Sequence, residues 1–238
     1  EMCIRDRVCR AYRLPCVSGK DSMKNDYGKG PNKISIPPTL LFSLFGDHPD
    51  VRNTATSDFK HSGDKVYLVG ESFDELGASE VSFMLRESSK TKGIGGRVPS
   101  LSNPKKLFKS YRLLSSAINS GLVKTAHDCS EGGIGITLAE MCIGGRIGAT
   151  IDLDGTGDCP LWSKLWGESL GRIVVAVSPE NEAAFLESMS GCITTYLGLV
   201  EDSDTLVILD GFEPLVATSV SELVHSWQGT LDMNGGEL

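Results

Sequence analysis

Short apolar runs recur along the chain, and polar or glycine-rich stretches separate them. The runs are rich in Val, Ile and Leu, a composition typical of buried β-strands. The pattern predicts strands at residues 64–70, 148–153, 171–177, 194–200 and 205–209. A longer run, residues 33–46, also has β-type composition. The tandem Pro37–Pro38 inside it predicts a sheet edge or a strand start, because proline cannot donate a hydrogen bond to a neighbouring strand.

Other segments show the spacing of a helix. One apolar face is formed by residues at spacings of four, three and four: Leu107, Tyr111, Leu114 and Ile118. Asn103–Pro104 suits the start of this helix, and Gly121 suits its end. Further helices are predicted at residues 133–142, 178–189 and 218–227, and residues 87–103 are predicted to be a loop.

Strands and helices alternate in this prediction, so the fold class is α/β or α+β. Residues 47–63 are polar and contain Asn, Ser and Gly, which predicts a domain boundary within a few residues of Ser62. The chain therefore divides into three predicted parts: residues 1–60, residues 61–227, and a polar, glycine-rich tail at 228–238.

Composition narrows the class of protein. The 238 residues carry a net charge of −8, which argues against non-specific nucleic-acid binding. There is no apolar run long enough to span a membrane, and the N-terminal EMCIRDRVCR does not resemble a signal peptide. Its start is interpreted as a truncation or a joint. The seven cysteines form no CxxC pair, which favours reduced thiols and a cytoplasmic location.

The first candidate for chemistry is residues 14–26, LPCVSGKDSMKND. Glycine lets backbone amides approach a phosphate closely, and Lys and Ser supply further donors. The segment is not a P-loop, because Asp follows Gly-Lys where that motif requires Ser or Thr. On composition alone, a polar surface turn after a strand is favoured over a functional role.

The second candidate is residues 126–133, AHDCSEGG, which lead into a predicted helix. Ser and Gly at a helix N-terminus can present backbone amides to an anion, and Asp128 and Glu131 are hard oxygen ligands suited to Mg²⁺. From these residues alone, an ordinary helix cap formed by Asp128 or Ser130 is the favoured interpretation.

Two further segments are weaker candidates. Residues 166–172, WGESLGR, could line a phosphate site, but a surface ion pair between Glu168 and Arg172 is equally plausible. Residues 74–80, DELGASE, could bind a metal through carboxylates, but such segments are more often solvated turns. The sequence contains no HExxH motif.

Taken together and in this order, the segments resemble one family. VSGKDSMKND, KISIPPTLLFS, GDKVYLVG, DELGASE, AHDCSEGGIGITLAEM and GESLGRIVVAVSPEN are similar to consecutive blocks of phosphoribosylformylglycinamidine synthase. The similarity extends from about Leu14 to Trp227. Its most specific parts are SGKDS and HDxSEGG with their spacing. Selenophosphate synthetase, thiamine-monophosphate kinase and the hydrogenase maturation factors of the same superfamily fit less well.

The resemblance implies a reaction and its partners. The family uses ATP and Mg²⁺ to convert formylglycinamide ribonucleotide and ammonia to the amidine, with release of ADP and phosphate. A glutaminase domain or subunit supplies the ammonia. Residues 1–60 would be the end of an N-terminal-type synthetase domain and 61–227 a C-terminal-type domain of the aminoimidazole ribonucleotide synthetase-like fold. The family's catalytic histidine, with the other synthetase domains, would lie upstream of residue 1.

The resemblance also implies roles for residues of the first block. Gly19 matches a nucleotide contact and Ser22 a substrate contact. Lys20 stands where smaller family members carry a metal-binding Asn, and a protonated lysine cannot bind Mg²⁺. We therefore expect Lys20 to contact substrate instead.

In the second block, Asp128 matches a Mg²⁺ ligand, and Ser130, Gly132 and Gly133 match nucleotide contacts. In the larger single-chain forms, this second nucleotide is held as a structural element and is not turned over. One departure lies elsewhere: Ala78 stands where the family usually has a second glycine.

Three hypotheses follow. The chain is part of the amidating ligase, or it mainly holds a structural Mg-nucleotide and a domain interface, or it belongs to another ATP-dependent enzyme of the superfamily, such as one similar to selenophosphate synthetase. The first two are compatible within one protein.

Overall fold

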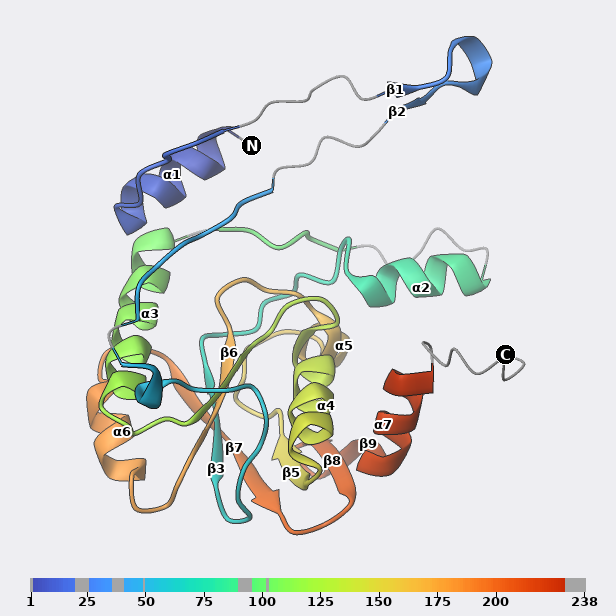
Figure 1. Cartoon of the computed structure of the whole chain (residues 1–238). Coiled ribbons are helices and arrows are strands. Elements are labelled where there is room, and N and C mark those ends of the chain that lie inside the picture. The colour runs from blue at the N-terminus through green and yellow to red at the C-terminus, as the bar shows by residue number, and fades with distance from the viewer. Residues whose placement is uncertain are drawn as a thin grey trace. The chain divides into compact units, whose positions relative to one another are not determined.

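The computed structural model describes most of the chain, namely residues 2–19, 26–35, 41–48, 50–89, 96–101 and 103–229 (Figure 1). Its internal contacts divide it into two units, Glu1–Val51 and Arg52–Leu238. The domain boundary expected near residue 60 stays a prediction.

The described part of the first unit contains little regular structure. Its elements are α1 (Met2–Tyr12), β1 (Asp26–Tyr27), a 3₁₀ turn (Gly30–Asn32) and β2 (Ile34–Ser35), and β1 and β2 pair antiparallel. Residues 41–46 form no strand, so the prediction of a β-type run is wrong there. Residues 36–40, with the two prolines, lie outside the described residues.

The second unit is built on a seven-stranded sheet in the order β4-β6-β3-β7-β5-β8-β9. Its strands are β3 (Lys65–Val69), β4 (Thr125–Asp128), β5 (Gly148–Asp152), β6 (Ile173–Val177), β7 (Thr194–Glu201), β8 (Thr205–Asp210) and β9 (Glu213–Ser219). All neighbouring strands are antiparallel except β5 and β8, which are parallel.

Helices connect the strands. They are α2 (Glu80–Ser89), α3 (Pro104–Asn119), α4 (Gly133–Gly145), α5 (Leu161–Trp166), α6 (Glu182–Ser188) and α7 (Val220–Gly229). In Figure 1, α3 and α6 lie together on the left, and α4, α5 and α7 lie on the right. The architecture is a mixed α/β domain, as the sequence predicts.

The central strands bury both of their faces. Side chains alternate between the two faces of a strand, so Val66 and Leu68 enter a cluster with α4, whereas Tyr67 and Val69 enter a second cluster with α3 and α6. Because helices cover both faces at β3 and β6, these strands are apolar except for Lys65 at the start of β3, which explains why their sequences are nearly continuous apolar runs.

The five predicted strands are confirmed, and so is the α3 helix. Asn103 caps it as expected, because its side-chain oxygen accepts a hydrogen bond from the Lys106 amide at 3.0 Å. The helix predicted to stop at residue 142 continues to Gly145. In the second unit, the sequence analysis missed the helices α2 and α5 and the strands β4 and β9. In the described part of the first unit, it missed α1 and β1.

No helix in the described segments has the length and apolarity needed to cross a membrane.

Candidate functional site

The second candidate block forms the turn between the edge strand β4 and α4. Asp128 is the last residue of β4, and α4 begins at Gly133. Gly132 and Gly133 have φ angles of 76° and 64°, a left-handed conformation that glycine adopts without a steric penalty. The tandem glycines therefore permit a sharp entry into the helix directly after the strand.

The carboxylate of Asp128 is held in place and remains accessible. Ser130 Oγ donates to Asp128 Oδ2 at 2.5 Å, and 71% of the Asp128 side chain is exposed. The hydrogen bond from Ser130 lowers the pKa of Asp128 from its usual range, against the opposing effect of partial burial. Asp128 is therefore anionic at neutral pH, as a Mg²⁺ ligand must be.

His127 lies between two carboxylates. Its Nδ1 is 3.5 Å from Asp128 Oδ1, and its Nε2 is 3.1 Å from Glu140 Oε2 on α4. Both ring nitrogens therefore face carboxylates of the chain itself. This arrangement suits a residue that supports Asp128, and we assign His127 no acid–base role.

The amides of the tandem glycines already have acceptors. The Gly132 amide donates to Glu168 Oε1 at 3.0 Å, and the Gly133 amide donates to the Ser130 carbonyl at 3.1 Å. An anion that used these amides would replace acceptors of the chain itself. The assignment of Gly132 and Gly133 to nucleotide binding stays a prediction.

The third block, which includes Glu168, joins the turn through that hydrogen bond. The same Glu168 Oε1 also accepts from the Glu80 amide, at the start of α2, at 2.8 Å. The surface ion pair considered for Glu168 and Arg172 is wrong, because Arg172 is only 1% exposed. Its guanidinium donates to the carbonyls of Gly167 and Ser169 and to Ser72 Oγ.

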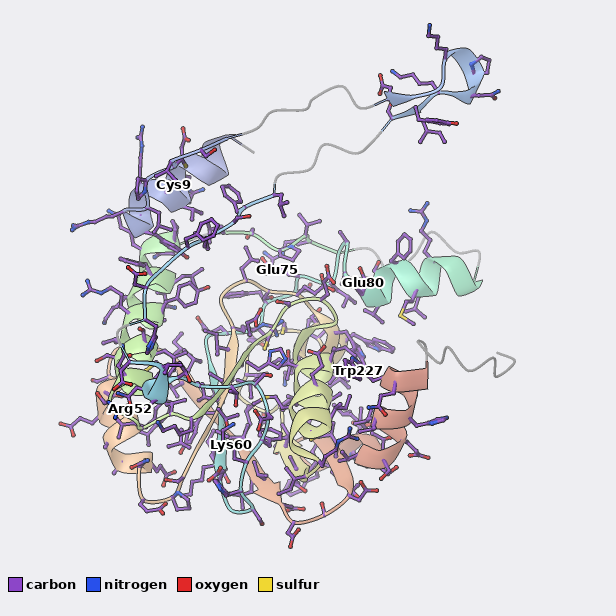
Figure 2. All side chains as sticks on the ribbon, in the orientation of Figure 1. Cys9, Arg52, Lys60, Glu75, Glu80 and Trp227 are labelled. Atoms are coloured by element: carbon purple, nitrogen blue, oxygen red, sulfur yellow. The ribbon has the colours of Figure 1, made fainter. Side chains whose placement is uncertain are left out.

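The fourth block, residues 74–80, leads into α2, and Figure 2 shows Glu75 and Glu80 along it. Glu75 is 5% exposed, and its Oε1 accepts from the amide and hydroxyl of Ser100. Ala78 has a φ of 60°, in the left-handed region where glycine is favoured. Ala78 therefore replaces the family's second glycine at a position where glycine would relieve backbone strain.

The first block is only partly described. Gly19 is exposed in the first unit, and Lys20 and Ser22 lie outside the described residues. The structure therefore brings together three of the four candidate blocks, all within the second unit. The roles expected for Gly19, Lys20 and Ser22 stay predictions.

The described residues can supply only some of the ligands that a Mg²⁺ ion needs. No group of three or more His, Cys, Asp or Glu side chains that could hold a metal occurs among them. Mg²⁺ is usually bound by one or two carboxylates together with phosphate oxygens and water, rather than by an all-protein cage. Asp128 can supply one such carboxylate, and a bound nucleotide would supply the phosphate oxygens.

We expect Gly133→Ala to destabilise the second unit more than Gly155→Ala. Both glycines have positive φ, so either substitution by alanine introduces backbone strain that costs about 1–2 kcal/mol. A Cβ at Gly133 would also lie 2.5 Å from the Gly167 carbonyl oxygen, whereas the nearest atom at Gly155 is 3.7 Å away. The clash should add about 1–3 kcal/mol. Urea denaturation measures both values, and equal losses would contradict the contact with Gly167.

The fold and the turn define a class of protein: a mixed α/β domain in which a strand ends at a carboxylate and a glycine pair opens the next helix. Residues 61–210 match the family described as "AIR synthase related protein, C-terminal domain". Because the match covers more than half of the chain, the chain belongs to this family. It is a domain of the PurM-like superfamily, whose members are ATP-dependent enzymes.

Solved structures of Thermotoga maritima PurL share the fold. The complex with FGAR has a TM-score of 0.61 at 18% identity, covering 73% of this chain and 30% of that one. The complex with ATP has a TM-score of 0.54 at 19% identity, covering 71% and 27%. The PurLQS structure has a TM-score of 0.52 at 20% identity, covering 72% and 27%. The chain thus spans less than a third of each PurL chain.

Proposed function

We propose that this chain is part of the ATP-dependent ligase that converts formylglycinamide ribonucleotide and ammonia to formylglycinamidine ribonucleotide in purine biosynthesis. One observation carries the proposal. The most specific block, HDxSEGG, forms the β4–α4 turn of an AIR synthase-type domain, where the anionic, exposed Asp128 lies beside Ser130. Solved complexes of the similarly folded PurL with FGAR and with ATP agree with it.

The roles in this proposal follow the chemistry of each group. Asp128 supplies a carboxylate oxygen to Mg²⁺, and Ser130 orients that carboxylate and contacts the nucleotide. Mg²⁺, when bound, offsets the charge of the phosphates. Gly19 contacts nucleotide, and Lys20 and Ser22 contact the ribonucleotide substrate. Other synthetase domains and a glutaminase would be the partners, and the PurLQS assembly gives a precedent in a distant relative.

A specific observation also supports a binding role for the second unit. Its turn offers an accessible carboxylate, but both nitrogens of the neighbouring His127 face carboxylates of the chain. The turn is therefore suited to binding a Mg-nucleotide through Asp128. In the second candidate function, the turn holds a structural Mg-nucleotide while chemistry takes place elsewhere in the synthetase.

The experiment is ADP formation by the parent synthetase containing this chain, supplied with ATP, Mg²⁺, ammonia and formylglycinamide ribonucleotide. We expect turnover that depends on the ribonucleotide and falls in Ser22→Ala. Turnover that requires selenide instead would contradict the proposal and favour a selenophosphate synthetase-like enzyme. No turnover by a folded protein that still binds Mg-ADP would favour the purely structural nucleotide.

A further inference from the structure

One carboxylate oxygen links two distant parts of the second unit. Glu168 Oε1 accepts from the Glu80 amide at 2.8 Å and from the Gly132 amide at 3.0 Å. Glu80 is the first residue of α2, where an anionic group is favoured by the helix dipole. The side chain therefore connects the start of α2 to the turn that precedes α4.

The backbone on both sides of Glu168 is fixed by Arg172. Its guanidinium donates to the carbonyl of Gly167 and, at 3.1 Å, to the carbonyl of Ser169, the two residues that flank Glu168. A third hydrogen bond reaches Ser72 Oγ at 2.9 Å. Among the described residues, no acidic group lies within ion-pair distance of this buried guanidinium. The arginine therefore shapes the loop that presents Glu168.

Glu168 binds a part of the backbone that has unusual conformational freedom. Gly132 and Gly133 both have positive φ, and glycine loses more conformational entropy on ordering than any other residue. A single strong acceptor at the Gly132 amide therefore has a large influence on which conformation the turn adopts. Hydrogen bonds to a charged acceptor are also stronger than neutral ones.

We propose that Glu168 is a positioning residue for the candidate nucleotide site, and that it holds the Asp128–Gly133 turn in the conformation that binds Mg-nucleotide. This inference rests on the proposed function of that turn. Glu168 acts through the Gly132 amide and does not itself contact the metal. Its removal should therefore weaken nucleotide binding while the sheet and the main core remain formed.

The test measures the Kd for ADP in the presence of Mn²⁺, and hydrogen exchange at the Gly132 and Glu80 amides, in the full chain. Glu168→Ala should raise the Kd by about 10–100-fold, the usual effect of losing a group that orients a metal ligand. It should also speed exchange at both amides. In Glu168→Gln, an amide oxygen can still accept both hydrogen bonds, so Kd and exchange should stay near wild type.

Glu222→Ala is the matched control. Glu222 Oε2 accepts from the Ser219 amide at 3.2 Å at the start of α7, so this variant also removes a carboxylate that accepts a backbone hydrogen bond at a helix start. We expect its Kd for ADP to equal that of wild type. If Glu168→Ala does not fold, Glu168→Asp serves in its place, because its shorter side chain cannot reach both amides.

The outcomes separate the two proposals. If wild type binds Mn-ADP and Glu168→Ala binds it equally well or more tightly, the positioning role is overturned and the proposed function stands. If folded wild type does not bind Mn-ADP, the nucleotide site is overturned, and this role of Glu168 with it. A raised Kd in Glu168→Ala with rescue in Glu168→Gln supports the positioning role.

Discussion

Replacing Arg172 by alanine should lower the free energy of unfolding of the second unit by about 3–5 kcal/mol. The side chain is 1% exposed, and its three hydrogen bonds end on groups that would be left without a partner: Gly167 O, Ser169 O and Ser72 Oγ. Hydrogen bonds to charged groups contribute about 1.5–3 kcal/mol each, and the truncation also leaves a cavity. Urea denaturation followed by circular dichroism measures the loss.

Two further variants show whether the planar guanidinium group of Arg172 is responsible for this loss of stability. Arg172→Lys keeps the charge, but a single ammonium group cannot reproduce the three donors with their spacing, so we expect an intermediate loss. Arg112→Ala removes an exposed arginine of α3 and should change stability by less than about 0.5 kcal/mol. A loss in Arg172→Ala no larger than in Arg112→Ala would contradict the central role of the guanidinium.

Sequence patterns predicted the elements that are buried on both sides or capped by local chemistry. The strands β3 and β6 lie between two layers of helices, so they are apolar at every position except Lys65 and stand out in the sequence. The helix cap at Asn103 can likewise be predicted from neighbouring residues, because its side chain accepts a hydrogen bond from an amide only three residues away. Such features need no knowledge of the rest of the fold.

The missed elements depend on tertiary context. β4 and β9 are the two edges of the sheet, and β4 has the polar sequence TAHD. β9 contains Pro214, which is tolerated at an edge but argues against a strand in a sequence. The helix α5 is only six residues long, too short for a periodic pattern. At 41–46 the opposite error arose, because apolar composition alone indicated a strand.

The candidate site shows the same limit. Each of its blocks is a weak signal by itself, because a turn with Gly, Ser and Glu is common on protein surfaces. Glu168 meets partners that lie 36 and 88 residues away in the chain, at Gly132 and Glu80. No local pattern reveals such a contact. For Arg172, the sequence suggested a surface ion pair, whereas the residue is buried among carbonyls.

The second large effect is expected from Asp128→Asn, which should abolish the Mg²⁺-dependent part of nucleotide binding. Asparagine keeps the size of the side chain and an oxygen that can accept from Ser130, but it loses the charge that favours Mg²⁺. At a ligand concentration of 100 times Kd, binding stabilises wild type by about 2.7 kcal/mol. We expect most of this stabilisation to disappear in the variant. Thermal unfolding with ADP, with and without Mg²⁺, measures it.

Ser130→Ala tests what lowers the pKa of Asp128. The hydroxyl of Ser130 is the main reason that the pKa of Asp128 is low, so its loss should raise that pKa. Binding that requires the carboxylate is lost as pH falls through the pKa, so the loss of Mg²⁺-dependent binding in acid should shift to higher pH.

The control for Asp128→Asn is Asp202→Asn, on the exposed β7–β8 turn. This variant removes the same charge and should leave nucleotide binding unchanged. An equal Mg²⁺-dependent shift in Asp128→Asn and wild type would show that Asp128 does not hold the ion.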